Sequence, residues 1–178
     1  MLKMIICTCG GDFAIGKDNA LLHYCKEDLK YFSKTTTDNV VLMGNNTYKS
    51  LQALGMENGL PNRYNVVLSK TPRNTNEKYF EHGVDTPTFI TDLNMFLNWG
   101  TMYANNILEK DTYIIGGRSV YEQCKDFVQE VYWTRVDKTF PDADTHFDMR
   151  WVEDEEVFEQ VSEECLCEDV VVKVFKRL

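Results

Sequence analysis

The sequence predicts an α/β fold: a mixed, mostly parallel central sheet flanked by helices, with a C-terminal antiparallel hairpin. Over the first two thirds of the chain, short apolar runs alternate with helical patterns, which favours parallel strands joined by crossover helices. The last third carries strand patterns alone, and its final runs, 156–165 and 170–175, flank the turn residues Glu168 and Asp169. The length of 178 residues is that of one domain, which we expect to span 1–178.

Strands are expected where short apolar runs are closed by glycine, asparagine or other turn residues. The first, 4–9, ends at Gly10-Gly11, and the second, 40–43, ends at Gly44. Further strands are expected at 64–68, 89–90, 112–115 and 131–136. Because ligands of such sheets bind beyond the carboxyl ends of the strands, we expect the functional residues there.

Helices are expected between these strands, at 26–34, at 47–54, after Thr91-Asp92 and at 119–124. In the first of them, Leu29 and Phe32 fall on one side, and acidic residues in the first turn suit the helix dipole. Asn46 or Thr47 is expected to cap the second helix. Trp99-Gly100 is expected to end or kink the third.

The composition is that of an ordinary globular protein, with 43% hydrophobic and 26% charged residues. Its net charge of -9 at pH 7 argues against nucleic acid, which requires a concentrated basic face. The apolar start is too short for a signal peptide and no long apolar run follows, so no membrane partner is expected. We expect a cytoplasmic monomer whose partner is a small molecule, and an anionic ligand would need a local group of Arg and Lys.

The sequence contains six cysteines. Cys7 and Cys9, like Cys165 and Cys167, are separated by one residue, so each pair is expected on one side of a strand. In a reduced cytosol these side chains act as small hydrophobic residues. A zinc site would require C-x-x-C or nearby histidines, and because neither is present, no metal site is expected.

Segments at the expected strand ends resemble the dihydrofolate reductase family along nearly the whole chain. They are AIGKDNALLHYCKEDLKYF (14–32), VVLMGNNTYKSL (40–51), LPNRYNVVLS (60–69) and YIIGGRSVYEQ (113–123), with VYWT (131–134) and DTHF (144–147) as a weaker fifth. Their order and spacing make the set specific. The resemblance implies a dihydrofolate-reductase-like fold and reduction of 7,8-dihydrofolate to 5,6,7,8-tetrahydrofolate by hydride transfer from NADPH.

Asp28 is the central acidic residue of this resemblance. By itself, an acid in a helix's first turn usually compensates the dipole or is solvated. The resemblance implies that its carboxylate accepts paired hydrogen bonds from the pterin 2-amino group and N3, with Thr134 as the orienting hydroxyl. Asp28 would raise the basicity of N5 while an ordered water delivers the proton. Leu21, in a loop that closes over the nicotinamide, and Tyr121, beside the nicotinamide, complete the implied catalytic set.

The remaining substrate contacts are also implied by the resemblance. Besides Asp28 and Thr134 they are Ile6, Cys7, Leu29, Phe32, Leu51, Arg63 and Ile115. Without the resemblance, Leu29 and Phe32 on one helix face are simply core residues. Arg63 is implied to bind the α-carboxylate of the folate glutamate, because its planar fork meets a carboxylate bidentately.

NADPH is implied to lie across the starts of two helices. Ile115-Gly116-Gly117 ends a strand and opens a helix, where backbone N–H groups suit a pyrophosphate and glycine allows close approach. In the family, the Gly-Gly peptide is cis. The residues implied to bind the cofactor are Thr8, Ile15, Asn19, Ala20, Gly44, Asn45, Asn46, Thr47, Leu68, Ser69, Lys70, Gly116, Gly117, Arg118, Ser119 and Tyr121.

Three positions depart from the family pattern, one of them the glycine-rich turn, which reads G-G-R-S at 116–119. Asn45 stands where the family usually has a basic residue, so a preference for NADPH over NADH rests on Lys70 and on Arg73 or Arg118. Leu22-His23 replaces a Pro-Trp or Pro-Leu pair. Because histidine changes charge near pH ~6.5, we hypothesise that His23 adds an ionisation to the pH–rate profile; a solvated loop histidine is the alternative.

Two other functions remain open at this point. A pyrimidine reductase of riboflavin synthesis shares the fold, but it would not need Asp28 together with Phe32 and Arg63. The other is a folate- or nucleotide-binding structural protein that keeps the pocket without turnover. A turnover assay with NADPH and dihydrofolate separates them.

Overall fold

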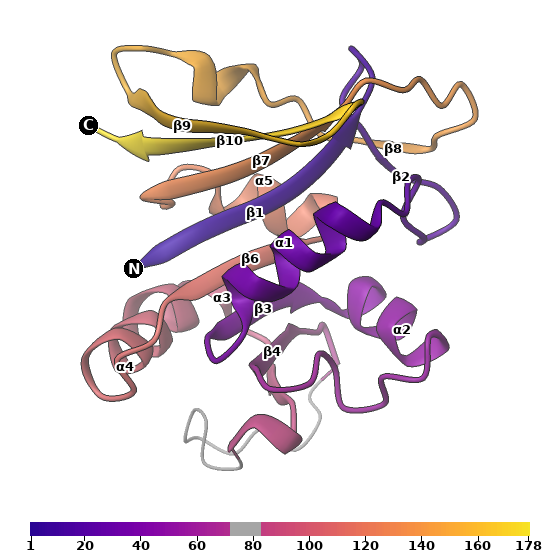
Figure 1. Cartoon of the computed structure of the whole chain (residues 1–178). Coiled ribbons are helices and arrows are strands. Elements are labelled where there is room, and N and C mark those ends of the chain that lie inside the picture. The colour runs from indigo at the N-terminus through magenta and orange to yellow at the C-terminus, as the bar shows by residue number, and fades with distance from the viewer. Residues whose placement is uncertain (72–82) are drawn as a thin grey trace.

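A twisted mixed sheet runs through the centre of the computed structural model, which describes residues 1–71 and 83–178 (Figure 1). Its main strands are β1 (Leu2–Cys9), β3 (Val40–Gly44), β4 (Tyr64–Leu68), β5 (Thr88–Ile90), β6 (Thr112–Gly116), β7 (Glu130–Val136), β9 (Phe158–Cys167) and β10 (Val170–Arg177). They lie in the order β5-β4-β3-β6-β1-β7-β10-β9. From β5 to β7 all neighbours are parallel, and β10 is antiparallel to both β7 and β9. The expected architecture is therefore present.

Helices cover both faces of this sheet, as a parallel sheet requires. They are α1 (Lys26–Thr36), α2 (Asn45–Ala53), α3 (Leu93–Met95), α4 (Thr101–Asn106) and α5 (Arg118–Cys124), with the short helices η1 (Gly83–Asp85), η2 (Phe96–Gly100) and η3 (Arg150–Glu153). Alternate residues of each strand point to opposite faces. Ile5 packs towards Phe32 of α1 and Tyr48 of α2, whereas Ile6 packs towards Val120 of α5 and Phe96.

The second helix begins earlier than expected. Asn45 is already helical and Gly44 is the N-cap, with no side-chain hydrogen bond capping the helix. The expected cap at Asn46 or Thr47 is therefore wrong. The backbone turns into the helix directly at the end of β3, which leaves no residue between strand and helix to act as a side-chain cap.

The helical segment after Asp92 is kinked and does not end at Gly100. Asp92 Oδ1 accepts a hydrogen bond from Met95 N at 2.9 Å, which confirms the expected cap. Phe96–Gly100 then forms a π-helical turn, and the chain continues through α4 to Asn106. An ideal Cβ at Gly100 would lie 2.3 Å from the Phe96 ring, so this turn requires a glycine for space.

Two shorter strands attach the loop after β1 to the sheet. β2 (Ala14–Gly16) pairs with the end of β1, and it also pairs with β8 (Thr145–His146). β2 gives this loop a fixed position beside the carboxyl end of β1. Within residues 1–71 and 83–178, no helix is long and apolar enough to cross a membrane.

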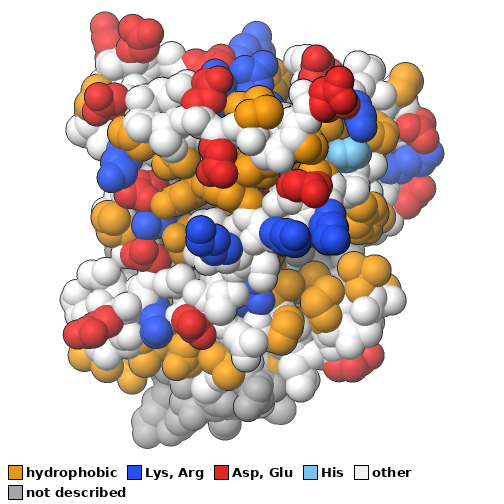
Figure 2. Space-filling model, viewed as in Figure 1, with side chains coloured by type: hydrophobic (Ala, Val, Ile, Leu, Met, Phe, Trp, Pro, Cys, Tyr) orange, Lys and Arg blue, Asp and Glu red, His pale blue; other side chains and the backbone are white. Residues whose placement is uncertain are grey.

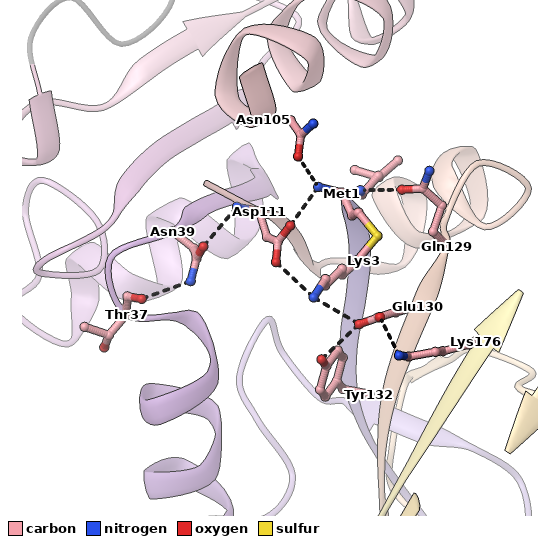
Figure 3. A network of polar contacts seen from close by, with 11 residues as sticks. Met1, Lys3, Thr37, Asn39, Asn105, Asp111, Gln129, Glu130, Tyr132 and Lys176 are labelled. Atoms are coloured by element: carbon pink, nitrogen blue, oxygen red, sulfur yellow. Dashed lines mark hydrogen bonds and ion pairs between the residues drawn. The ribbon is translucent and has the colours of Figure 1, made fainter. Parts of the chain in front are cut away.

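The amino ends of β1, β6 and β7 are joined by a network of charges (Figure 3). Lys3 Nζ lies 2.9 Å from Asp111 Oδ2 and 3.0 Å from Glu130 Oε2. The α-ammonium of Met1 lies 2.7 Å from Asp111 Oδ1, and the Tyr132 hydroxyl donates to Glu130 Oε2 at 3.0 Å. These contacts fasten one end of the sheet, and the opposite end carries the candidate site.

Candidate active site

Asp28 lies in the first turn of α1 and faces the central strands. Its Oδ1 accepts a hydrogen bond from Thr134 Oγ1 at 2.8 Å. Cys7, whose thiol helps to lower the pKa of this carboxyl, pairs with Thr134 across β1 and β7. Three of the expected residues therefore meet at one point. One comes from the first strand, one from the first helix and one from the last third of the chain.

Burial dominates the electrostatics of Asp28. Loss of water raises the pKa of its carboxyl above the ordinary value, and hydrogen bonds from Thr134 and Cys7 and the charge of His23 offset only part of this effect. A carboxylate has about four lone-pair sites, so these neighbours leave it able to accept further N–H donors. A perturbed carboxyl with acceptor sites to spare is typical of a functional group.

An apolar wall lies beside this carboxyl. Phe32, Leu51 and Ile115 are partly buried against the same cluster of core residues, which includes Ile5 and Met43. Leu29 and Leu21 remain 43% and 52% exposed. The structure thus brings together three of the expected apolar contacts and leaves two more exposed to solvent.

Arg63 is buried and already bound to protein oxygens. Its Nε donates to Thr36 Oγ1 at 3.1 Å, its Nη1 to Pro61 O at 2.6 Å and its Nη2 to Ser33 Oγ at 3.2 Å. Burial lowers the pKa of the guanidinium, and the charge of Asp38 opposes that shift. Arg63 is therefore held in one geometry, and a bound carboxylate would have to share these donors.

Asn65, which sequence reasoning did not single out, fixes the loop that carries Arg63. Its Oδ1 accepts from Leu60 N at 2.9 Å, and its Nδ2 donates to Leu60 O at 2.9 Å and to Arg63 O at 3.1 Å. An asparagine on a buried strand among apolar residues was the available signal, because a buried amide must find hydrogen-bond partners.

The starts of α2 and α5 converge at the carboxyl ends of β3 and β6. A Cβ at Gly44 would lie 3.2 Å from the Val120 side chain, and a Cβ at Gly117 would lie 3.5 Å from Thr47 Oγ1. The Gly116–Gly117 peptide is cis, as in the family pattern. Asn45 Oδ1 is buried without a hydrogen-bond partner in the described residues. Two sets of helix-terminal N–H groups and an unsatisfied polar atom therefore meet here.

The side chains of Thr8 and Tyr121 form hydrogen bonds with other groups in the protein interior. Thr8 Oγ1 accepts from Trp133 Nε1 at 2.9 Å, and the Tyr121 hydroxyl donates to Ile5 O at 3.0 Å. Burial raises the pKa of Tyr121. Any contact that Thr8 makes with a cofactor would therefore come from its backbone.

The loop that carries Leu21 is held on two sides. Asp18 N donates to Asp144 Oδ2 at 2.8 Å, and Asp144 N donates to Gly16 O at 3.1 Å. On the other side, Ser50 Oγ of α2 donates to Asn19 O. Ser50 and Asp144 were not predicted as site residues.

In the same loop, Lys17 Nζ forms an ion pair with Asp142. Ile15 lies against the core, and Asn19 and Ala20 are exposed.

The residues expected at the adenosine end are spread over two loops. Leu68 is partly buried at the end of β4, Ser69 is buried with its Oγ accepting from Thr71 N at 3.3 Å, and Lys70 is exposed. Asn46, Arg118 and Ser119 are exposed at the starts of their helices. Arg73 lies outside the described residues.

Arg118 also borders a hollow of about 490 Å³ that excludes Asp28. Its other lining residues are Gly11, Asp12, Phe13, Glu122, His146, Asp148 and Arg150. The Asp28 site is identified by its geometry and electrostatics and does not belong to this hollow.

A row of cations runs along the solvent-exposed side of α1 on an otherwise acidic molecule. Lys26, Lys30 and Lys34 recur every fourth residue of α1 and are exposed. Figure 2 shows such a blue row across the middle of the face on which α1 lies in Figure 1. This is the local basic group that an anionic ligand would need on a chain with a net charge of -9.

The sequence profile of the dihydrofolate reductase family matches residues 1–173. The chain belongs to the dihydrofolate reductase family. It is 30% identical over 122 residues to dihydrofolate reductase type 9 of Escherichia coli, and 32% identical over 123 residues to a dihydrofolate reductase of Ureaplasma parvum. Each match covers 68% of this chain, but only 63% and 66% of those proteins, so the chain spans less than two thirds of their length.

A solved dihydrofolate reductase from Enterococcus faecalis, complexed with NADP(H) and RAB-propyl, has the same fold. The TM-score is 0.75 and the sequence identity 23%, with 99% of this chain and 96% of that chain covered. This confirms the expected fold class. The roles of individual residues remain predictions.

Proposed function

We propose that this member of the dihydrofolate reductase family reduces 7,8-dihydrofolate to 5,6,7,8-tetrahydrofolate with NADPH. The observation that carries the proposal is the partly buried Asp28 carboxyl, hydrogen-bonded to Thr134 Oγ1 at 2.8 Å and raised in pKa by burial. It lies at the carboxyl ends of the central strands, where ligands of such sheets bind. Family membership supports the same reaction. We further propose that the chain acts as a single-domain cytoplasmic monomer.

Asp28 would anchor the pterin through paired hydrogen bonds from the ring's 2-amino group and N3. Thr134 and Cys7 fix the carboxylate from the other side. Phe32, Leu51 and Ile115 offer the apolar wall for the rings. Arg63, which contacts Ser33 on the helix that also carries Lys30 and Lys34, would supply positive charge for the glutamate tail.

The residues at the starts of α2 and α5 fit NADPH. Gly44, Asn45 and Thr47 on one side, and Gly117 with Arg118 on the other, would hold its phosphates through helix-terminal N–H groups. When bound, NADPH supplies the hydride that the pterin receives at C6. Asn45 contributes no charge, so the preference for the 2′-phosphate falls to Lys70 and Arg118.

The proton for N5 would come from water that Asp28 orders. Burial raises the pKa of the Asp28 carboxyl above that of an exposed one, which makes it a weaker acid, so proton delivery would fall to the ordered water. The loop carrying Leu21, held by Ser50 and Asp144, would exclude bulk water from the reacting atoms. Tyr121 stays out of this proton transfer, because its hydroxyl is bonded to Ile5 O.

The test is a turnover assay that follows NADPH absorbance with dihydrofolate as substrate. We expect turnover with dihydrofolate and none with the aminopyrimidine substrate of riboflavin synthesis, and faster turnover with NADPH than with NADH. Folded protein that binds NADPH and dihydrofolate without turnover would instead indicate a binding protein. Equal rates with both cofactors would remove Lys70 and Arg118 from the proposed phosphate site.

A further inference from the structure

Two thiols and a carboxylate join the start of α1 to the C-terminal hairpin. Cys25 immediately precedes α1, Glu27 lies in its first turn, and Cys167 ends β9. Cys25 Sγ lies 3.6 Å from Cys167 Sγ and 3.4 Å from Glu27 Oε2, and all three donor atoms lie within 4.8 Å of one another. In Figure 1, the turn between β9 and β10 lies on the same side as the start of α1.

The Cys25–Cys167 and Cys25–Glu27 distances match the edges of a tetrahedral metal site. With metal–sulfur bonds of about 2.3 Å and metal–oxygen bonds of about 2.0 Å, tetrahedral angles place two sulfurs roughly 3.8 Å apart, and a sulfur and an oxygen roughly 3.5 Å apart. The 3.6 and 3.4 Å separations fall within about 0.2 Å of these values. A disulfide would need the sulfurs about 2.05 Å apart and would make no use of Glu27.

The surroundings of the three groups also suit a bound cation. Cys25 is buried, and Leu22, Phe140 and Leu166 are among the residues packed around it and Cys167. This partly apolar shell limits competition from water. Glu27 is exposed, so the group remains open to solvent on one side, where a water can complete the coordination.

We propose that Cys25, Glu27 and Cys167 bind one divalent cation of the Zn²⁺ class, with water as the fourth ligand. Two thiolates and a carboxylate are a suitable donor set for such a borderline-soft ion. Binding releases both thiol protons to solvent and transfers no electrons. No metal site was expected from the sequence, because it offers neither C-x-x-C nor nearby histidines. Cys25 and Cys167 are 142 positions apart, and only the fold brings them together.

The bound ion would clamp the first turn of α1 to the hairpin. Asp28 lies three residues after Cys25 on that turn, so the ion would help to fix the position of its carboxyl. The binding proposal itself rests on the three donor atoms and is independent of the proposed reductase activity. Metal binding and turnover are accordingly measured separately.

The experiment titrates the reduced, metal-free chain with Zn²⁺ in competition with a chromophoric chelator, and records the Co²⁺ spectrum. Three variants remove one ligand each: Cys25→Ser, Cys167→Ser and Glu27→Gln. The matched control is Cys165→Ser, because Cys165 is an exposed cysteine on the same strand. Circular dichroism establishes that each variant is folded.

We expect the wild-type chain and Cys165→Ser to bind one Zn²⁺ with equal affinity, and their Co²⁺ forms to show thiolate charge-transfer and tetrahedral bands. The Cys25→Ser and Cys167→Ser variants should bind roughly hundredfold more weakly or worse, since loss of even an outer partner costs about 10–100-fold. Equal loss in Cys165→Ser would overturn the proposal, as would a Cys25–Cys167 disulfide that persists under reductant. Because Glu27 is exposed, the Glu27→Gln variant should fold normally. A Zn²⁺ affinity equal to that of the wild-type chain in this variant would also overturn the three-ligand site.

Discussion

At the scale of single residues, Asp28 shows how one position can favour chemistry over stability. Its charged form loses water on folding, and the hydrogen bonds from Thr134 and Cys7 do not fully compensate, so its pKa is raised. A carboxyl whose pKa is raised by folding lowers the stability of the folded state at pH values above that raised pKa. This loss of stability disappears as the pH falls below the ordinary pKa of the carboxyl. The site thus retains a charge that folding alone would disfavour.

Replacing Asp28 by Asn should separate these two effects. We expect turnover at neutral pH to fall by at least about a hundredfold, with a smaller deficit at acid pH, where solvent protonates the pterin more readily. The melting temperature of the ligand-free variant should equal or exceed that of wild type at pH 7, and the difference should shrink on acidification. Steady-state rates and thermal melts check both, and a variant as active as wild type would remove Asp28 from the mechanism.

His23 acts on Asp28 through its charge, which lowers the pKa of that carboxyl. The structure also places its ring 6.4 Å from that of Phe140. We expect His23→Trp to remove an ionisation from the pH dependence of kcat. A profile that keeps its shape in the variant would show that His23 is only a solvated loop residue. His146→Gln, at a histidine paired with Asp12, serves as the control.

At the scale of elements, the Leu21 loop depends on a contact from a helix remote in sequence. Ser50 Oγ donates to Asn19 O and to Asn46 O. Ser50→Ala should weaken the closed loop by about 1 kcal/mol, the usual net value of one hydrogen bond, and so lower kcat roughly fivefold. Stopped-flow and steady-state rates measure this, with the exposed neighbour Lys49→Ala as control. If Ser50→Ala and Lys49→Ala lower kcat equally, the hydrogen bond from Ser50 does not specifically hold the Leu21 loop.

The π-helical turn between α3 and α4 makes a second prediction at this scale. A methyl group at Gly100 would meet the ring of Phe96, which is fully buried and has no space to move. Gly100→Ala should therefore destabilise the protein by about 1–3 kcal/mol, despite the better helix propensity of alanine. Denaturant unfolding measures the loss, and Asn98→Ala on the exposed side should change it little.

At the scale of the whole molecule, the two ends of the sheet have different tasks. The amino ends of β1, β6 and β7 are closed by Lys3 with Asp111 and Glu130. Burial alone would raise the pKa of each carboxyl. The α-ammonium of Met1 and Lys3 together outweigh this effect at Asp111, and Lys3 with Tyr132 and Lys176 outweighs it at Glu130, so both pKa values are lowered. Their stabilising effect is therefore present above their ordinary pKa and is lost as the pH falls through the lowered one.

Lys3→Met should reveal this contribution. The variant leaves Glu130 buried without Lys3, which typically costs about 3–5 kcal/mol. The loss should be largest at neutral pH and should shrink as the pH falls through the lowered pKa values of the two carboxyls, because protonated carboxyls need no counter-charge. Unfolding free energies measured from neutral to acid pH test this. A loss that does not depend on pH would point to packing of the lysine stem.

Much of the fold was predictable because its signals are local. Apolar runs closed by turn residues marked β3, β4 and β6 to within one residue, and the side-chain pattern of Leu29 and Phe32 marked α1. Asp92 was predictable as a cap because it acts on its own helix. The start of α2 and the π turn were not predictable, because strand geometry at Gly44 and ring packing at Phe96 decided them.

The candidate site divides in the same way. The sequence by itself determined the family, the fold class and the identity of Asp28, Thr134 and the glycines at the helix starts, because each occurs in an ordered local motif. Only the tertiary structure decided that Thr134 reaches Asp28, that Ser50 holds the Leu21 loop and that Cys25 meets Cys167. Such contacts join residues far apart in the chain, and their distances follow from the packing of the whole sheet rather than from any short pattern.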